Sequence, residues 1–119
     1  MATFSTHILS SLDGTHLSDV LVCLVEIQVT GKRKIIFQKK TDSGGRMSTQ
    51  FSPNIAENFE YEFTVSPPVS FNHNQKTDKI KNYTRISSLS VRIKIENADA
   101  NYHIPFILSP YGFSSWVSR

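Results

Sequence analysis

Cysteine is almost absent from this sequence, which has one such residue, Cys23, in 119 positions. That count excludes an intramolecular disulfide framework and any cysteine-rich zinc site. Cys23 lies inside the apolar run formed by residues 20–25. We expect it to be a small buried hydrophobic residue, because a reactive thiolate needs an electropositive and partly exposed setting.

Long hydrophobic runs are also missing. No apolar stretch approaches the ~20 residues that a membrane-spanning helix requires. Residues 1–4 lack the basic start and the long apolar centre of a signal peptide. We therefore expect a cytosolic protein without a membrane partner.

The net charge of the sequence is also small. Lys and Arg number 13 against 10 Asp and Glu, which gives a net charge of +3. Nucleic-acid binders usually gather their positive charge on one face or one helix, whereas here it is scattered, so we expect no nucleic-acid partner. The hydrophobic content of 39% is ample for a core, and the length suits a single domain over residues 1–119.

What the sequence does contain is strand patterning. Apolar and polar residues alternate in residues 59–65 and 89–96, as in strands with one face on a core. Residues 20–27 are apolar on both faces and precede Thr30-Gly31, which predicts a central strand with a hairpin partner over residues 34–38. Shorter strands are expected at residues 4–9 and 47–51.

The C-terminal third adds one more strand and a break. Residues 102–108 read as a strand, although Pro105 has no N–H and so indicates a sheet edge or a locally unpaired backbone group. Residues 109–112 then interrupt it. The polar stretch between Pro68 and Arg85 is expected to be an exposed loop with at most one short helix. About seven or eight strands predict an all-β fold, a two-sheet antiparallel sandwich.

Four histidines are the obvious candidates for chemistry: His7, His16, His73 and His103. No pair has zinc-site spacing, so we expect neither a metal nor a cofactor. His16 follows Gly14-Thr15 in a turn and His73 lies in the polar loop, which makes both solvated surface residues. His7 and His103 lie in strands among apolar neighbours, where a histidine is more often a hydrogen-bonded structural residue than a catalyst.

Three blocks of the sequence resemble one known family. They are Ser5-Thr6-His7-Ile8-Leu9, the segment Thr41-Asp42-Ser43-Gly44-Gly45-Arg46, and the long segment Tyr102-His103-Ile104-Pro105-Phe106-Ile107-Leu108-Ser109-Pro110-Tyr111-Gly112-Phe113-Ser114. Together they resemble 5-hydroxyisourate hydrolase, the transthyretin-related enzyme of urate breakdown. The resemblance implies a transthyretin-like sandwich that assembles as a homotetramer, a dimer of dimers, with active sites in the cleft between dimers.

The same resemblance implies the site residues. Carried over position by position, the catalytic set is His7, Arg46 and His103, of which His7 and Arg46 would also bind the substrate. Transthyretin, the hormone carrier of the same fold, lacks that set. A neutral imidazole suits the activation of water near neutral pH, and a guanidinium suits stabilisation of the charge that develops on the carbonyl oxygen. Which histidine is the base stays open.

The C-terminus departs from the family pattern. The family usually ends in Tyr-Arg-Gly-Ser, whereas this chain ends in Trp116-Val117-Ser118-Arg119. Trp116 takes the place of a tyrosine that, by the resemblance, lines the substrate site, and Ser118 is the serine nearest to the missing terminal one. We therefore expect Trp116 and Ser118 to bind the substrate. Two alternatives follow: a transthyretin-like carrier with weakened catalysis, or a sandwich that serves only in protein interaction. The ending is not Ser-Lys-Leu, so the cytosol is expected, with the peroxisome as the alternative.

Overall fold

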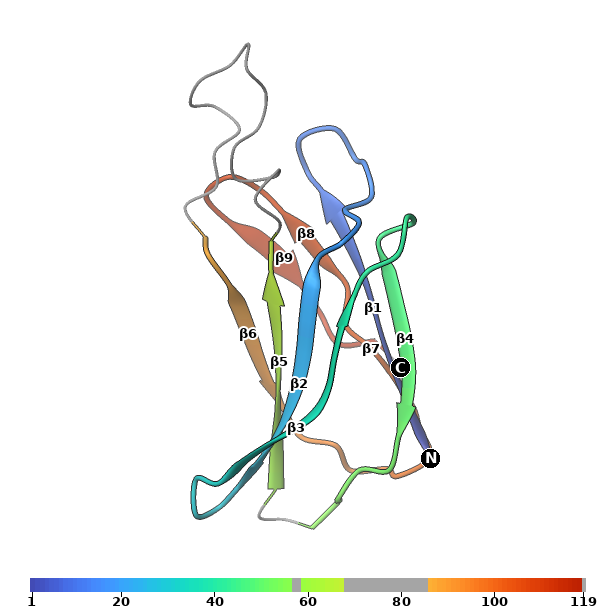
Figure 1. The fold of residues 1–119 in the computed structure, drawn as a ribbon, viewed down its shortest axis with the longest axis vertical. Helices are drawn as coiled ribbons and strands as arrows, with labels where there is room; N and C mark the ends of the chain where they lie inside the picture. Colours follow the sequence, from blue (N-terminus) through green and yellow to red (C-terminus); the bar gives the residue numbers. More distant parts are fainter. Residues whose placement is uncertain (57–58, 68–85, 119) are drawn as a thin grey trace.

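The chain forms a β-sandwich in the computed structural model, which describes residues 1–56, 59–67 and 86–118 (Figure 1). These residues form strands and no helix. The strands are β1 (Ala2–Ser10), β2 (Leu21–Gln28), β3 (Arg33–Lys40), β4 (Arg46–Phe51), β5 (Phe59–Ser66), β6 (Leu89–Ile93), β7 (Asn101–His103), β8 (Phe106–Leu108) and β9 (Phe113–Ser115).

Two sheets make up the sandwich. A five-stranded sheet has the order β4-β1-β8-β9, with β7 paired to β1 beside β8, and a four-stranded sheet has the order β3-β2-β5-β6. Most pairs are antiparallel, but β1 pairs in parallel with both β7 and β8. The all-β two-sheet sandwich expected from the sequence is therefore confirmed, and the parallel pairing of the first strand with the C-terminal strands is added to it.

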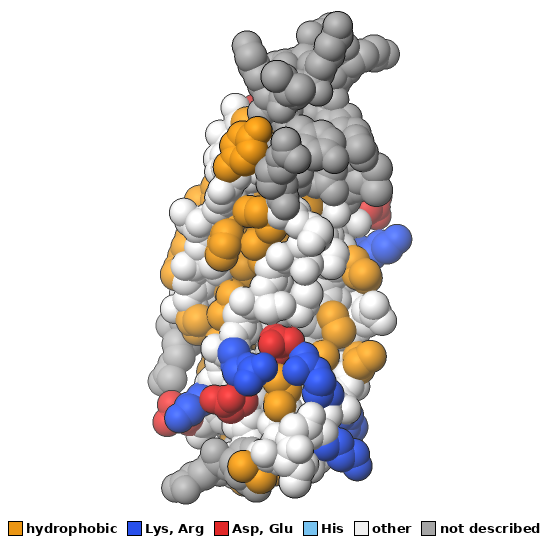
Figure 2. Space-filling model, turned by 90° about the vertical axis from the view of Figure 1, so that its left-hand side faces the viewer, with side chains coloured by type: hydrophobic (Ala, Val, Ile, Leu, Met, Phe, Trp, Pro, Cys, Tyr) orange, Lys and Arg blue, Asp and Glu red, His pale blue; other side chains and the backbone are white. Residues whose placement is uncertain are grey.

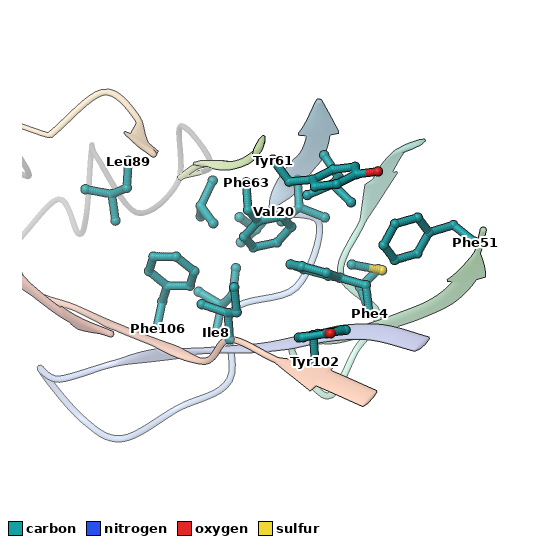
Figure 3. Packing of buried hydrophobic residues seen from close by; sticks show 14 of the residues in the cluster. Phe4, Ile8, Val20, Phe51, Tyr61, Phe63, Leu89, Tyr102 and Phe106 are labelled. Carbon is teal, nitrogen blue, oxygen red and sulfur yellow. The ribbon is translucent and has the colours of Figure 1, made fainter. Parts of the chain in front are cut away.

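The core lies between the sheets and is rich in phenylalanine. In Figure 3, Phe4, Ile8, Tyr102 and Phe106 project from one sheet toward Phe63 on the other. The ring centroids of Phe4 and Phe63 are 4.7 Å apart. Because successive residues of a strand point to opposite faces, anchoring Phe4 and Ile8 in the core directs Ser5 and His7 outward.

Most strand predictions are confirmed. The hairpin of β2 and β3 forms as expected, β2 is central, and the odd-numbered residues of β5 from Tyr61 to Val65 are buried. Strand β9 is not predicted by the sequence pattern, which ends at the Ser109-Pro110-Tyr111-Gly112 turn. The single strand expected over residues 102–108 is divided at Ile104 and Pro105. The polar loop, with His73, lies outside the described residues.

Pro105 lies in the interior of its sheet rather than at an edge. Its segment runs between β1 and the C-terminal strand β9, so the expected edge position was wrong. The Pro105 carbonyl oxygen accepts a hydrogen bond from the Ser115 hydroxyl at 3.0 Å. The buried Thr6 hydroxyl donates to the Ile104 carbonyl oxygen at 2.6 Å, which pairs a backbone acceptor next to the break. The divided strand thus keeps its place beside β1.

The prediction that Cys23 is buried was wrong. Its side chain lies on the outer face of the four-stranded sheet and is partly exposed. Partial burial nevertheless raises the pKa of the Cys23 thiol, which disfavours the reactive thiolate.

Charged side chains gather on part of the surface beside β6. Figure 2, which looks onto this side of the molecule, shows lysine or arginine and acidic residues grouped below a more hydrophobic area. Glu62 pairs with Arg33 and, at 3.2 Å, with Arg92. The described residues contain no helix long and apolar enough to cross a membrane.

Candidate active site

The outer face of the five-stranded sheet carries the candidate site. Along β1 the side chains of Phe4, Thr6 and Ile8 are buried, so Ser5 and His7 lie on the opposite face. In β4 the buried Met47 likewise leaves Arg46 outward. One period-two pattern therefore places residues of both strands on a common surface.

Strand register then sets these residues side by side. His7 of β1 lies directly opposite Arg46 of β4. Ser5 lies opposite His103 of β7, and His103 lies opposite Ser118 in the segment that follows β9. The structure brings all three residues of the expected catalytic set, His7, Arg46 and His103, onto one face of one sheet.

The turn before β4 positions Arg46. The Asp42 carboxylate accepts hydrogen bonds from the backbone N–H groups of Gly44, at 2.9 Å, and of Arg46, at 3.0 Å. Gly45 has a φ of 72°, and a Cβ at this residue would lie 2.7 Å from the Ile8 carbonyl oxygen. Only glycine suits both the left-handed conformation and the close approach to β1.

His103 is held from both sides. Its Nδ1 lies 2.8 Å from the Ser5 hydroxyl oxygen. On the other side its backbone N–H donates to the Ser118 carbonyl oxygen at 2.9 Å, and its carbonyl oxygen accepts from the Ser118 N–H at 2.7 Å. Ser5 thus engages one of the two ring nitrogens of His103.

The electrostatics of the site favour neutral imidazoles. Partial burial lowers the pKa of His7, and the charge of Arg46 lowers it further, with smaller contributions from His16 and His103. Burial followed by Arg46 lowers the pKa of His103 in the same direction. One guanidinium thus acts on both rings, and a neutral imidazole is the form that accepts a proton.

His16 was expected to be a solvated turn residue, and the structure corrects this in part. Its side chain is exposed, but its Nδ1 lies 2.9 Å from Nε2 of His7. The planes of the two rings are nearly parallel, with an interplanar angle of 21°, and the ring centroids are 5.0 Å apart. The chain turns near Gly14-Thr15, as expected. The sequence did not predict that residue 16 then pairs with Leu9 of β1.

The C-terminal segment runs along the site. Strand β9 pairs with β8 and the Ser118 bridge pairs with His103 in the same antiparallel register, which places Trp116 opposite Pro105. Trp116 is 51% exposed and Val117 is 49% exposed. The sequence-based assignment of Trp116 and Ser118 to substrate binding stays a prediction; of the two, Ser118 lies directly opposite His103.

Two residues of the site had only indirect signals in the sequence. Ser5 lies two positions before His7, so the strand alternation already put it on the same face. Asp42 belongs to a recognisable turn motif, but its role in holding Arg46 needed the structure. Among the described residues no cluster of three or more His, Cys, Asp and Glu side chains is arranged to hold a metal ion.

Two surface pockets of the described residues lie elsewhere. One is bordered by Ile55, Phe59 and Ile95 near the start of β5, and the other by Val29 and Arg92. Neither includes a histidine. The candidate site lies on the outer face of the five-stranded sheet, where Arg46 is exposed and His7 and His103 are partly exposed.

The sequence of this chain is similar to those of known proteins. The sequence matches the HIUase/Transthyretin family over residues 4–117. A 5-hydroxyisourate hydrolase from Halalkalibacterium halodurans is 25% identical over 118 residues, and the alignment covers 94% of this chain and 93% of that protein.

Solved structures show the same fold. The 5-hydroxyisourate hydrolase of Klebsiella pneumoniae matches with a TM-score of 0.72 and 22% identity over 100% of both chains. Transthyretin from Sparus aurata matches with a TM-score of 0.70 and 14% identity, over 97% of this chain and 95% of that one. With the family match spanning nearly the whole sequence, the chain belongs to the HIUase/Transthyretin family.

Proposed function

We propose that this protein is a hydrolase that opens the ring of 5-hydroxyisourate with water, in the breakdown of urate. One observation carries the proposal: His7, Arg46 and His103 share one face of a sheet, and Arg46 lowers the pKa of both imidazoles. The relative from Halalkalibacterium halodurans, named for this activity, supports it.

The reaction begins with the activation of water. Water is a poor nucleophile near neutral pH, so a base that is unprotonated at that pH is needed. His7 and His103 both meet this requirement because their pKa values lie below the ordinary value. One ring removes a proton from water as the oxygen attacks a ring carbonyl carbon. The other can orient the water or protonate the departing nitrogen.

Arg46 supplies the positive charge. Attack on the carbonyl puts negative charge on its oxygen, and a fixed guanidinium beside that oxygen stabilises the transition state. The guanidinium is planar and presents several N–H donors, so it also suits the polar edge of a flat heterocycle. The Asp42 carboxylate restrains the backbone from which Arg46 extends. No step requires a cofactor.

We also propose that the site is completed in a homotetramer, a dimer of dimers. The site lies on an open face, whereas stabilisation of charge is strongest where water is excluded. Trp116, which is 51% exposed, follows the edge strand β9 and lies opposite Pro105 in the register of the same sheet. A second copy packed over this face would exclude water from the histidines and cover this apolar side chain.

The test is the disappearance of 5-hydroxyisourate, generated freshly and followed by its ultraviolet absorbance with and without the protein. The compound also decays unaided, so the measured quantity is the rate in excess of buffer. We expect an excess rate proportional to protein concentration. The Arg46→Ala variant serves as a matched control, and an absence of any excess rate with the folded wild-type protein would contradict the proposal.

A second candidate is a transthyretin-like binding protein for a small ligand. The exposed Trp116 and Val117 beside the site favour it, because they replace a tyrosine and a basic residue that the resembled enzymes carry. Such a protein would bind a flat ligand on this face without hydrolysing it. Saturable quenching of Trp116 fluorescence by 5-hydroxyisourate analogues, combined with no excess hydrolysis, would favour this candidate.

A further inference from the structure

A histidine outside the expected catalytic set contacts the site. The His16 Nδ1 and the His7 Nε2 lie 2.9 Å apart, which is hydrogen-bonding distance. In a neutral pair of imidazoles, one facing nitrogen carries a proton and the other accepts it. The two rings therefore share one hydrogen between these nitrogens, and the orientation of each ring depends on the other.

The backbone fixes His16 even though its side chain is exposed. Residue 16 pairs with Leu9 of β1 as an isolated bridge, and the Leu17 N–H donates to the Ile8 carbonyl oxygen at 2.9 Å. A Cβ on Gly45 would lie 3.2 Å from the His16 Cβ. The missing side chain of Gly45 therefore leaves the space in which His16 approaches β1.

We propose that His16 is a positioning residue for His7: before substrate binds, it holds the His7 ring in one tautomer and one orientation, with Nε2 kept as the proton-accepting nitrogen. This inference rests on the proposed hydrolase function and extends it to a residue that the resemblance did not include. A base or acid catalyst must be held in its productive geometry, and a misplacement of about 1 Å can lower the rate by about 100-fold.

The charges that face His7 come from four parts of the fold. Arg46 projects from β4, Asp42 from the turn before it, His103 from β7 and His16 from the loop after β1. The backbone of Gly44 also hydrogen-bonds to His7 in the sense that raises its pKa, as a carbonyl acceptor does. With Nε2 engaged by His16, Nδ1 is the nitrogen left for Gly44. The expected tautomer of His7 therefore has its proton on Nδ1.

Two substitutions separate the hydrogen bond from the charge. In His16→Asn the side-chain amide lies close to the position of Nδ1, so it can still bond to His7 but cannot become charged. In His16→Ala both are lost. Ser18→Ala, an exposed position of the same loop, is the control for local changes in folding.

The first readout is nitrogen NMR of the imidazole rings, which requires no substrate. We expect the wild-type and Asn proteins to show a single His7 tautomer, and the Ala protein to show a mixture. The pKa of His7 should rise in both variants, because the positive charge of His16 no longer opposes protonation. An Ala variant whose His7 tautomer and pKa both equal those of the wild type would overturn the proposal, whether or not the protein hydrolyses 5-hydroxyisourate.

The second readout is kinetic. For His16→Ala we expect kcat/KM to fall about tenfold, mainly through kcat, while His16→Asn retains most of it. A merely structural role would lower the melting temperature of both variants without this difference in rate. Equal losses of kcat/KM in the Asn and Ala variants would contradict positioning through the hydrogen bond. Failure of the wild type to hydrolyse the substrate would instead reject the proposed function. The NMR experiment would then still test whether His16 fixes the tautomer and the pKa of His7.

Discussion

At the scale of residues, the guanidinium of Arg46 acts on both candidate histidines. Arg46 is exposed, yet its charge lowers the pKa of both His7 and His103. For Arg46→Ala we expect kcat/KM to fall by about 100-fold or more, the scale on which a charge-stabilising group contributes. Arg46→Lys, which keeps the charge but not the planar fork, should lose less. Steady-state kinetics with 5-hydroxyisourate measures both.

The same substitution gives an independent signature. Removing the guanidinium should raise the pKa of both imidazoles, so the acidic limb of kcat/KM should move to higher pH. Near-wild-type turnover in folded Arg46→Ala protein, or an unmoved acidic limb, would remove Arg46 from the catalytic set.

The two lowered histidine pKa values also link stability to pH. In the unfolded chain each imidazole takes up a proton near its ordinary pKa of about 6.5, whereas the folded protein takes it up only at lower pH. As pH falls below about 6.5 the unfolded state therefore binds more protons, and the free energy of unfolding should decrease. Urea denaturation at several pH values between about 5 and 8 tests this.

A double variant isolates that contribution. His7→Gln with His103→Gln should show a flatter dependence between about pH 5.5 and 7, because the two titrations are removed. Carboxylates with lowered pKa, such as Glu62, act at more acidic pH, and their stabilisation is lost as pH falls through their folded pKa. An unchanged slope in the double variant would contradict the assignment to the histidines.

At the scale of elements, the turn between β3 and β4 is the device that presents Arg46. Gly45 and Gly31 both have positive φ, 72° and 90°, but only at Gly45 would a Cβ clash. Gly31→Ala should cost about 1–2 kcal/mol, the cost of a left-handed non-glycine residue. Gly45→Ala should cost more and should also lower kcat, since the turn shifts away from β1. Chemical denaturation and kinetics of the pair make the comparison, and equal losses would argue against the close approach.

The segment after β9 is the second element that shapes the site. Ser118 exchanges two backbone hydrogen bonds with His103. Deleting residues 116–119 should therefore loosen His103, and we expect kcat/KM to fall about tenfold or more. Trp116→Tyr should retain or raise activity, because a phenol both donates and accepts a hydrogen bond while indole only donates. A truncated protein with the full-length rate would show that this terminus has no part in the site.

Strand periodicity predicted most elements, and the limits of that prediction have physical causes. Alternation identified β5 and β6, because one face of each is packed on the core, and the apolar run before Thr30-Gly31 identified the β2–β3 hairpin. It missed β9, whose three residues are too few to show a period and whose Phe113 is half exposed. The pairing of His16 with His7 follows from the path of an exposed loop, which hydrophobic patterning does not encode.

At the scale of the molecule, the site joins the two ends of the chain. β1 comes from the N-terminus, β7 and Ser118 from the C-terminus, and they meet through the parallel pairing of Ser5 with His103. No local pattern could predict this contact between distant residues, so His7, Arg46 and His103 were grouped by resemblance alone. The structure supplies the physical reason, since one register places them on one face.

Assembly is the remaining property of the whole molecule. Strand β9 lies at the edge of its sheet, and the unpaired backbone groups of an edge strand favour pairing with a second copy. Phe113, the first residue of β9, is 48% exposed, and Trp116, which follows β9, is 51% exposed. Val29 is 75% exposed in the β2–β3 hairpin, away from that edge. In sedimentation velocity at micromolar concentration, wild type and Val29→Glu should both sediment as tetramers.

Phe113→Glu should dissociate that tetramer, because a carboxylate would be buried without a partner in the contact. Loss of the tetramer should also lower the hydrolysis rate, since water would then reach His7 and His103 from the open face. A wild-type protein that stays monomeric at this concentration would contradict the proposed assembly. A Phe113→Glu variant that remains tetrameric would place the contact between copies on another edge of the sandwich.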